Sequence, residues 1–497
     1  MTPRLTPSRD EFPRLARQGN VIPIFAELIG DAETPVSALA KLCSSAGHSF
    51  LFESTEKNDV SGRFSFLGID PRAVITSRGR ELLVRHRGTE RTLQIATDPL
   101  DELRKLLAGY RFVTCPELSR FSGGAVGFVG YEAVNFFEPT VPVADKDELH
   151  LPQILFMITS NLLIFDHRRR SLKVVVNAFT DDGDLEQVYT TAADEIARIV
   201  GRLSAPAQSQ LISTERPDAT APSSNFSRKG FESAVKRAKE YIRAGDIFQV
   251  VLSQRFESEF SGAAVDFYRC LRFINPSPYM FCLTFGEEFA LVGSSPEMHV
   301  RLVDGAIDIR PIAGTRPRGE TVEQDERNAT DLLADEKERA EHVMLVDLAR
   351  NDIGRVAKYG TVCVTELMNV ERYSHVMHIV SNVSAQLRES CDAFDLLRAT
   401  FPAGTVSGAP KIRAMQIIAE LEGAQRGCYA GAIGYFGFDG NLDSCIALRC
   451  AVLKNGRAYF QAGAGIVSDS NPASEFDETV NKARAMQRAV EMATQTR

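Results

Sequence analysis

Three two-residue turn signals in the second half of the chain constrain its fold most strongly: Asp304-Gly305, Asp439-Gly440 and Asn455-Gly456. Each stands between stretches rich in apolar residues, and Asp-Gly or Asn-Gly in that setting is typical of a two-residue β-hairpin. The sequence therefore predicts antiparallel sheets in which strands that follow one another along the chain also pair in space.

Counting outward from the first turn, Asp304-Gly305, predicts which residues share one end of a sheet. The two serines at 294–295 would lie roughly opposite Gly314 and Thr315, and Glu297 would lie one pair further in. Antiparallel pairing would thus gather hydroxyl, glycine and carboxyl groups that are far apart in the sequence.

The other two turns predict a three-stranded meander over residues 429–467. Counting back from them places Tyr429, Arg449 and the "GAG" segment of 463–465 at one end of that meander. A basic side chain beside free backbone N–H groups is a setting that suits an anionic ligand.

The first half of the chain shows the same alternation of apolar and polar residues about polar turns, at 73–95 and 162–179. Residues 183–203 have the apolar period of an amphipathic helix, and residues 227–246 predict a second one that begins with a serine cap and ends at Gly245. Strands and helices in this arrangement indicate an α+β fold with large antiparallel β-sheets flanked by helices.

The segment between these helices is rich in Ala, Pro, Ser and Thr and has little periodicity, which indicates a surface connection. We therefore expect an N-terminal α+β region over 1–203, a connecting loop over 204–226 and a C-terminal region over 227–497. A chain of 497 residues is long enough for such a division.

Composition excludes several classes of protein. The net charge of −8 argues against a nucleic-acid partner, and no apolar run approaches the length of about 18 residues that a membrane helix needs. The N-terminus is proline-rich and charged and has no apolar core like that of a signal peptide. Nine cysteines without a C-x-x-C spacing fit reduced thiols in a cytoplasmic protein.

Two predicted helices carry paired acids. The first, at 335–353, places Glu338 and Glu341 three residues apart on one face, and the second, at 471–492, aligns Glu475, Glu478 and Lys482. Such pairs most often lie on a solvated surface, where each contributes only tenths of a kcal/mol. The alternative is a Mg²⁺ site, because Mg²⁺ takes one or two carboxylates and fills its other positions with water and an anionic substrate. No His/Cys cluster suggests zinc.

A set of six motifs, in order and at consistent spacing, resembles the chorismate-utilising enzymes, which include anthranilate, aminodeoxychorismate, isochorismate and salicylate synthases. The motifs are "PIAGT", "EHVMLVDLARND", "FPAGTVSGAPKIRAM", "YAGAIGYF", "GAGIV" and "SEFDETVNKA". The resemblance is dense over 227–497 and thinner before it. It implies the two-lobed β-sandwich of that family and a chorismate-binding catalytic region.

The resemblance implies roles for the residues that match the family's motifs. Glu341 and Glu478 would bind Mg²⁺, which would hold the ring carboxylate of chorismate, and Glu338 and Glu475 would lie beside these ligands. The residues expected to contact chorismate itself are Gly314, Thr315, Tyr429, Arg449, Gly463, Ala464, Gly465 and Lys482. Arginine suits a carboxylate because its planar fork donates two parallel hydrogen bonds.

Two further residues match catalytic positions of the family. Glu297, in "SSPEMHV", corresponds to the general acid, which is needed because hydroxide is a poor leaving group and must be protonated as the ring C–O bond breaks. His375, in "ERYSHVMHIV", corresponds to an active-site histidine that we assign to the loss of the pyruvate side chain. His378 is expected to be structural.

Two positions indicate which nucleophile is used. Isochorismate and salicylate synthases carry a water-activating lysine where this chain has Gln249, and an amide cannot act as a base at neutral pH. Aminodeoxychorismate synthases typically carry a lysine at the centre of "PIKGT", where this chain has Ala313. Ammonia would therefore add directly at C2, and loss of pyruvate would give anthranilate, the first committed step of tryptophan synthesis.

The stretches "LFES" (51–54) and "INPSPYMF" (274–281) resemble the tryptophan-binding feedback site of anthranilate synthase large subunits. Ser54 would hydrogen-bond the effector, L-tryptophan. The residues expected to line its pocket are Asn275, Pro278, Tyr279 and Met280. The alternative is a strand edge packed on a proline-containing turn.

None of the nine cysteines lies in the glycine-rich elbow of a glutaminase nucleophile; Cys428, in "RGCYAG", is the nearest. We therefore expect a separate glutamine amidotransferase small subunit, and by resemblance a heterotetramer of two large and two small subunits. Two other functions stay open: an aminodeoxychorismate synthase, and a non-catalytic subunit that senses tryptophan. The complete set of acidic and basic site residues argues against the second.

Overall fold

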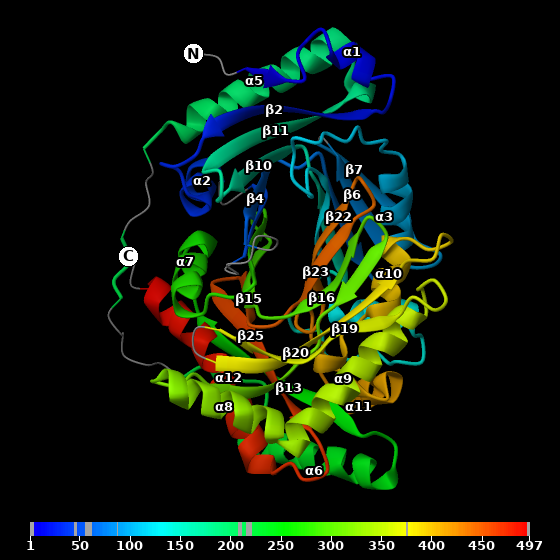
Figure 1. The fold of residues 1–497 in the computed structure, drawn as a ribbon, viewed down its shortest axis with the longest axis vertical. Helices are drawn as coiled ribbons and strands as arrows, with labels where there is room; N and C mark the ends of the chain where they lie inside the picture. Colours follow the sequence, from blue (N-terminus) through cyan, green and yellow to red (C-terminus); the bar gives the residue numbers. More distant parts are fainter. Residues whose placement is uncertain are drawn as a thin grey trace.

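The computed structural model describes residues 4–43, 47–54, 62–86, 88–206, 211–214, 221–373 and 376–494. Within these residues the chain forms two antiparallel sheets, of 13 and 12 strands, with helices packed outside them (Figure 1). The predicted α+β fold with large antiparallel sheets and flanking helices is confirmed.

The first sheet joins strands from both ends of the chain. Its order across the sheet is β1 (Leu5–Thr6), β2 (Val21–Ile29), β11 (Ser171–Phe179), β10 (Asn161–Asp166), β4 (Phe64–Ile69), β3 (His48–Glu53), β14 (Tyr279–Phe285), β15 (Phe289–Ser295), β24 (Cys450–Lys454), β25 (Arg457–Ile466), β13 (Gln249–Glu259) and β12 (Ser223–Ser224), with β21 (Gly408–Ala409) also on β13.

The second sheet also joins strands from both parts of the chain. Its order is β18 (Ile312–Pro317), β20 (Val376–Gln386), β17 (Ala306–Ile309), β16 (Met298–Val303), β23 (Leu442–Ile446), β22 (Ala432–Gly437), β8 (Gly124–Val129), β9 (Ile154–Ile158), β5 (Ala73–Arg78), β6 (Glu81–His86) and β7 (Thr89–Gln94), with β19 (Cys363–Arg372) also on β20. The segments 1–203 and 227–497 therefore contribute strands to both sheets.

Helices cover the outer faces of the two sheets (Figure 1). They are α1 (Phe12–Leu15), α2 (Pro35–Leu42), α3 (Pro99–Ala108), α4 (Val134–Phe137), α5 (Leu185–Leu203), α6 (Arg228–Ala244), α7 (Ala264–Ile274), α8 (Val322–Ala334), α9 (Glu336–Gly354), α10 (Ala393–Thr400), α11 (Lys411–Glu422) and α12 (Pro472–Thr494). Three short 3₁₀ turns lie in the described residues: η1 (Tyr131–Ala133), η2 (Thr180–Asp182) and η3 (Gly404–Val406).

The buried apolar side chains form layers that match this arrangement. One layer lies between the sheets and is rich in aromatic rings, among them Phe50, Phe128 and Phe281. A second lies between the first sheet and α2, α5, α7 and α12. A third lies between the second sheet and α3, α9 and α10, and it extends over β13 of the first sheet to α6 and α11. Burial of apolar surface on both faces of each sheet is the main stabilising contribution to the fold.

Predictions made from local signals are confirmed. The segments 73–95 and 162–179 form the hairpins β5–β6–β7 and β10–β11. Helix α6 begins where the Ser227 side chain accepts a hydrogen bond from the Gly230 N–H, and it ends at Gly245, whose φ of +84° lies in the left-handed region. Turn residues and caps act over a few residues, so their effect is independent of the tertiary fold.

The predicted partners of residues 294–295 are wrong, although the Asp304-Gly305 turn is correct and pairs Val303 with Ala306. The serines end β15, which pairs with β14 and β24 in the first sheet, whereas Gly314 and Thr315 lie in β18, which pairs with β20 in the second. The chain changes sheets between Ser295 and Met298, and counting along one hairpin assumed that it does not.

The meander predicted over 429–467 is wrong for the same reason. Strands β22 and β23 form a hairpin in the second sheet, and β24 and β25 form a hairpin in the first. The chain crosses between the sheets at residues 447–449, where Arg449 has a φ of +47°. Both turn signals are correct, but they connect strands within two separate hairpins.

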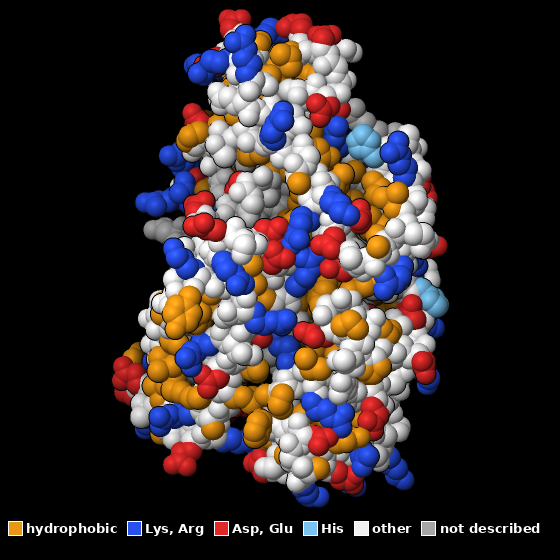
Figure 2. Space-filling view, turned by 90° about the vertical axis from the view of Figure 1, so that its right-hand side faces the viewer, with side chains coloured by type: hydrophobic (Ala, Val, Ile, Leu, Met, Phe, Trp, Pro, Cys, Tyr) orange, Lys and Arg blue, Asp and Glu red, His pale blue; other side chains and the backbone are white. Residues whose placement is uncertain are grey.

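The surface carries both charge signs. On the face shown in Figure 2, lysine and arginine side chains alternate with aspartate and glutamate. Among the described residues, no helix is both long enough and apolar enough to cross a membrane.

Candidate active site

Glu297 lies where the chain passes from β15 of the first sheet to β16 of the second. Its side chain is 6% exposed, and the Thr405 hydroxyl donates a hydrogen bond of 2.6 Å to its Oε1. Burial raises the pKa of Glu297 to about 8, against the opposing effects of the Thr405 hydrogen bond and the Arg449 charge. At neutral pH this carboxyl is therefore mainly protonated and able to donate a proton.

Arg449 lies at the second place where the chain changes sheets, between β23 and β24. The two crossings run side by side: Ile446 N–H donates to the Glu297 carbonyl (3.1 Å), and Ser294 N–H donates to the Arg449 carbonyl (3.0 Å). Burial lowers the pKa of Arg449, while the Glu297 charge acts in the opposite direction. The paired crossings thus bring a proton donor and a half-buried arginine to one place.

The glycines at the end of β25 lie against functional side chains. A Cβ on Gly463 would lie 2.8 Å from the Tyr429 hydroxyl oxygen, and a Cβ on Gly465 would lie 2.6 Å from Nε2 of Gln249. Both distances are shorter than ordinary contacts of a Cβ, so a side chain at either position would have to displace Tyr429 or Gln249. The expected meeting of Tyr429 with the "GAG" segment is therefore present, although the two belong to different hairpins.

Gly314 and Thr315 lie on β18, where Gly314 has a φ of +65°. His378 lies beside both: its Nδ1 donates to the Gly314 carbonyl at 2.8 Å and is 3.1 Å from the Thr315 hydroxyl oxygen. His378 thus contacts both residues of the "PIAGT" motif that were predicted to bind chorismate. His375, the predicted catalytic histidine, lies outside the described residues.

The first pair of predicted acids, Glu338 and Glu341 on α9, contacts residues of strands β13 and β18. Glu341 accepts a hydrogen bond of 3.2 Å from Nε2 of Gln249, and Glu338 accepts one of 3.2 Å from Arg316. Burial raises the pKa of Glu338, Arg316 opposes this rise, and the nearby negative charge of Glu341 adds to it. The pair is therefore held between β13 and β18.

The second pair, on α12, is more exposed. Glu478 forms an ion pair of 2.7 Å with Lys482, and the Lys482 ammonium also donates to the Gly463 carbonyl at 3.1 Å. Burial raises the pKa of Glu475, and the charge of Glu478 adds to this rise. Lys482 therefore connects the α12 acids to the glycine segment of β25.

The two pairs of acids influence one common cation. The pKa of Lys337, on α9, is raised chiefly by its hydrogen bond to Asp469 and further by the charges of Glu475 and Glu341. Since these charges act from α12 and α9 on one ammonium group, the two helices present carboxylates toward the same region.

The donors present fit Mg²⁺ in their chemistry. All four acids offer hard carboxylate oxygens, which Mg²⁺ prefers over nitrogen or sulfur. In the part of the chain that the structure describes, no group of three or more His, Cys, Asp or Glu side chains is close enough to hold a metal alone. A Mg²⁺ ion here would thus take one or two protein carboxylates and complete its coordination with water and substrate oxygens.

Two residues near the site were not predicted from the sequence. Thr405 lies inside the "FPAGTVSGAPKIRAM" motif, but its contact with Glu297 joins two positions 108 residues apart in the chain. Arg426 is 2% exposed and forms a bidentate pair with Glu422, while its guanidinium lies over the rings of Tyr131 and Tyr429. An arginine that precedes a glycine in a loop is usually exposed to solvent. Neither its residue type nor its neighbours in the sequence therefore indicated that Arg426 is buried.

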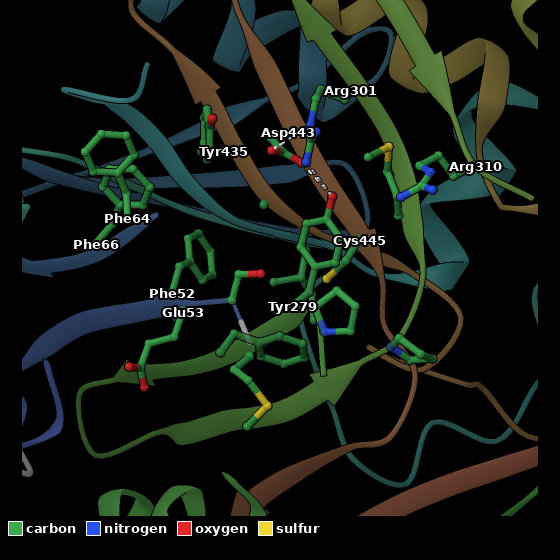
Figure 3. A pocket seen from close by; sticks show the side chains of 18 of the residues that line it. Phe52, Glu53, Phe64, Phe66, Tyr279, Arg301, Arg310, Tyr435, Asp443 and Cys445 are labelled. Carbon is green, nitrogen blue, oxygen red and sulfur yellow. Dashed lines mark hydrogen bonds and ion pairs between the residues drawn. The ribbon is translucent and has the colours of Figure 1, made fainter. Parts of the chain in front are cut away.

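A separate cavity of about 130 Å³ lies where β14 begins and β3 ends (Figure 3), and Pro296 and Met298, on either side of Glu297 in the chain, also line it. Four of the five predicted effector residues line it: Ser54, Pro278, Tyr279 and Met280. Asn275 is beside it instead, with its side chain donating to the Ser294 hydroxyl at 3.2 Å.

The walls of this cavity are aromatic and its far side is polar. Phe52, Phe64 and Phe66 lie on one side in Figure 3, and Tyr279 lies opposite them. The Tyr279 hydroxyl donates to Asp443 (3.1 Å) and accepts from Arg301 (3.1 Å). A cavity with aromatic walls and a few fixed polar groups suits a small aromatic ligand that also carries charge.

Comparison with known proteins supports the motif-based resemblance. A family model described as chorismate binding enzyme matches residues 47–488. The chain is 48% identical to the anthranilate synthase component 1 of Aquifex aeolicus (strain VF5), over 98% of each chain. It is 46% identical to that of Acetivibrio thermocellus, over 99% of each chain.

Solved structures agree with the fold. The crystal structure of anthranilate synthase component I from Streptococcus pneumoniae TIGR4 superposes with a TM-score of 0.76 at 38% identity, covering 93% of this chain and 98% of that one. The menaquinone-specific isochorismate synthase of Escherichia coli superposes with a TM-score of 0.71 at 21% identity, covering 97% and 98%. The second likeness concerns the fold alone.

Proposed function

Because the chain belongs to the chorismate binding enzyme family, we propose that it acts as the chorismate-converting large subunit of an anthranilate synthase, a lyase. Ammonia and chorismate would give anthranilate, pyruvate and water. The observation that carries this proposal is the buried carboxyl of Glu297, hydrogen-bonded to Thr405, at the paired crossings that also hold Arg449. Relatives of 46–48% identity bearing the component 1 name favour this member of the family.

The chain's own groups divide the work of binding and protonation. Arg449 and the backbone N–H groups of 463–465 suit the carboxylates of chorismate, because both donate hydrogen bonds and the glycines permit close approach. Glu297 would protonate the ring 4-hydroxyl as its C–O bond breaks, so that water leaves and not hydroxide. The site's burial helps, since it keeps this carboxyl protonated at neutral pH.

Glu341 and Glu478 would hold a Mg²⁺ ion, with Glu338 and Glu475 beside them. When bound, Mg²⁺ would supply positive charge against the ring carboxylate. Lys482 connects Glu478 to the Gly463 carbonyl and so would hold the α12 acids against the substrate-binding strand.

The choice of ammonia as the nucleophile depends on Ala313 and Gln249. Ala313 has no nucleophilic atom, which argues against covalent attack on the ring from the β18 turn. Gln249 lies against Glu341 and Gly465, and its amide cannot deprotonate water. Ammonia, the unprotonated form of ammonium, needs no such base. His375 is proposed to assist the later loss of pyruvate.

We also propose that L-tryptophan binds the aromatic cavity as a feedback inhibitor. Support comes from the four predicted residues that line it and from the charged Arg301–Asp443 pair, which could pair with the amino and carboxylate groups of an amino acid. Ammonia would come from a glutamine amidotransferase small subunit, in a heterotetramer of two copies of each chain.

One experiment tests the proposed function directly. The purified chain is incubated with chorismate, Mg²⁺ and ammonium, and the product is identified by fluorescence and mass. We expect anthranilate, formed only with divalent metal, abolished by EDTA and suppressed by L-tryptophan. A 4-amino product would indicate an aminodeoxychorismate synthase and overturn the role of Ala313. Isochorismate or salicylate would overturn the role of Gln249, and no turnover would favour a sensing subunit.

A further inference from the structure

A second, smaller cavity lies behind Glu297, on the side of the α9 and α10 helices. It has a volume of about 30 Å³ and is lined by Glu297, His299, Leu348, Ala349, Asp352 and Thr405, among others. Of the described residues predicted to bind substrate or metal, or to act in catalysis, Glu297 alone borders it. A cavity needs about 10–15 Å³ of this kind to hold one water molecule, so this one has room for one or two.

His299 borders this cavity with an unsatisfied polar atom. Its side chain is 3% exposed, and its Nδ1 lies 3.2 Å from the Ser444 hydroxyl oxygen. Its Nε2 has no hydrogen-bond partner among the described residues. Buried ring nitrogens are nearly always hydrogen-bonded, and an unpartnered one costs free energy, so a ligand in the cavity would be favoured.

Burial lowers the pKa of His299 to about 4, against the opposing effect of the Thr400 carbonyl. The ring is therefore neutral at working pH and attracts a neutral partner with both donor and acceptor capacity. Water has this capacity, and the polar groups around the cavity can give it the two to four contacts that buried waters make.

Two functional groups from one stretch of the chain border this water site. Glu297 and His299 are two residues apart along the chain at the start of β16, and both border the cavity. Asp352, on α9, borders it too; its carboxylate is 7% exposed and is paired with the Lys411 ammonium at 2.7 Å. The cavity thus connects a buried carboxyl that must be reprotonated in each turnover with a carboxylate–ammonium pair on the α9 side.

We propose that this cavity is a proton-return site, in which a water molecule anchored by Nε2 of His299 reprotonates Glu297. The inference rests on the proposed function, because it assigns Glu297 as the general acid. In each cycle the Glu297 O–H bond breaks and its proton leaves with the ring oxygen as water. The carboxylate then takes a proton from the cavity water, which is resupplied from solvent past Asp352. The nitrogen that bonds to the ring gives up one proton to solvent as it becomes a neutral amine, which matches the proton that Glu297 takes up. The proton released when ammonium becomes ammonia is the one net proton left in solvent, so the count balances.

His299 is thus a positioning residue, and its removal should slow only the turnovers that need reprotonation. His299→Phe keeps an aromatic ring against Phe401 but cannot anchor water. In rapid mixing at pH 7, where Glu297 starts protonated, we expect the first turnover within about threefold of the wild-type rate. We expect the following steady state to be slower by about tenfold or more. The solvent deuterium isotope effect should increase in the steady state and not in the first turnover.

Two further variants keep the test decisive. Ala349→Val fills the cavity from α9 without altering a polar group, and we expect it to give the same two-phase signature. His299→Gln retains a polar atom that can hold water, and we expect it to restore part of the steady-state rate. Ala399→Val, on α10 and away from the cavity lining, is the control for overpacking.

Loss of the first turnover and the steady state in equal proportion, or no change in either, would overturn the proposal. A crystal structure without water within hydrogen-bond distance of Nε2 would overturn it as well. The assay follows consumption of chorismate, whatever the product. An unexpected product therefore counts against the proposed function, while the comparison of variant and wild type still decides the proton-return site.

Discussion

The hydroxyl of Thr405 donates a hydrogen bond of 2.6 Å to Oε1 of Glu297, and it does so from a 3₁₀ turn that follows β20 and α10 in the chain. This bond stabilises the ionised form of a carboxyl whose burial has the opposite effect. The pKa of Glu297 is thus set by its burial, which raises it, and by the Thr405 hydroxyl and the Arg449 charge, which lower it. The Thr405 hydroxyl can therefore be removed to change this pKa.

Thr405→Val removes the hydroxyl while keeping the shape of the side chain. Since the hydrogen bond lowers the pKa of Glu297, its loss should raise that pKa above the present value of about 8. The protonated form then persists to higher pH, so the basic limb of the pH–rate profile should move upward. We also expect kcat to fall by about tenfold, because the carboxyl loses its orientation. Thr405→Ser should restore both, and an unchanged basic limb in the valine variant would contradict the assignment of Glu297.

The same carboxyl should affect stability. The pKa of Glu297 is about 8 in the folded chain and 4.5 when exposed, so its ionisation opposes folding. Its contribution to stability is fully present below pH 4.5 and is lost as the pH rises toward 8. Glu297→Gln, which cannot ionise, should therefore be more stable than the wild type at pH 8, by on the order of a few kcal/mol, and should lose this advantage near pH 5.

Urea unfolding of both proteins at pH 5, 6, 7 and 8 measures this difference. Asp392→Asn removes one negative charge at the N-cap of α10, and it is the control for an effect of net charge on stability. A difference between the Glu297 variant and the wild type that is constant over this pH range would exclude a raised pKa as its cause.

Local signals in the sequence predicted much of the fold, because caps and two-residue turns act through neighbouring residues. A helix begins after Ser227 and ends at Gly245 as expected, and each Asp-Gly or Asn-Gly signal lies at a turn. No local signal says which of two sheets a strand joins. The crossings at Glu297 and Arg449 therefore escaped prediction, although both residues were singled out.

The contacts that complete the site are long-range and depend on packing. Arg426 connects β13, η3 and α11 by donating to the carbonyls of Val251 and Val406 and to Glu422. His378 meets Gly314 across two neighbouring strands, 64 residues apart in the chain. Such contacts depend on the tertiary fold, so residue type and spacing alone could not have placed these side chains.

Gln249→Lys tests the contact between Gln249 and Glu341. The lysine ammonium would form an ion pair with Glu341 in place of the amide hydrogen bond, and it would compete with any divalent cation for that carboxylate. We expect the Mg²⁺ concentration for half-maximal activity to rise by about tenfold, since one net charge next to a ligand costs of the order of 1 kcal/mol or more. Gln249→Met, of similar length but uncharged, is the control.

Titration of Mg²⁺ into the EDTA-treated proteins gives these values, with anthranilate fluorescence as the readout. An equal rise in both variants would indicate that the glutamine acts through packing against Gly465 and not through charge. The products are identified at each step, because a lysine at this position would also permit attack by water.

The aromatic cavity is the proposed site at which L-tryptophan inhibits the enzyme. Ser54 borders it at the end of β3, and removal of a hydrogen bond to a bound ligand typically weakens binding by about threefold to tenfold. We therefore expect Ser54→Ala to raise the inhibition constant for L-tryptophan by that factor. Ser54→Phe, whose ring would occupy the cavity, should raise it by at least about thirtyfold. Ser233→Ala, on the exposed face of α6, is the matched control.

Direct binding separates this effect from changes in catalysis. The chain has no tryptophan residue, so added L-tryptophan is the only source of indole fluorescence, and its dissociation constant can be measured without chorismate. The dissociation constants should rise in the same order as the inhibition constants: Ser233→Ala, Ser54→Ala and then Ser54→Phe. If tryptophan binds the phenylalanine variant as tightly as the wild type, the effector lies elsewhere. In that case the Arg301–Asp443 pair has another role, since its charges would face no ligand in this cavity.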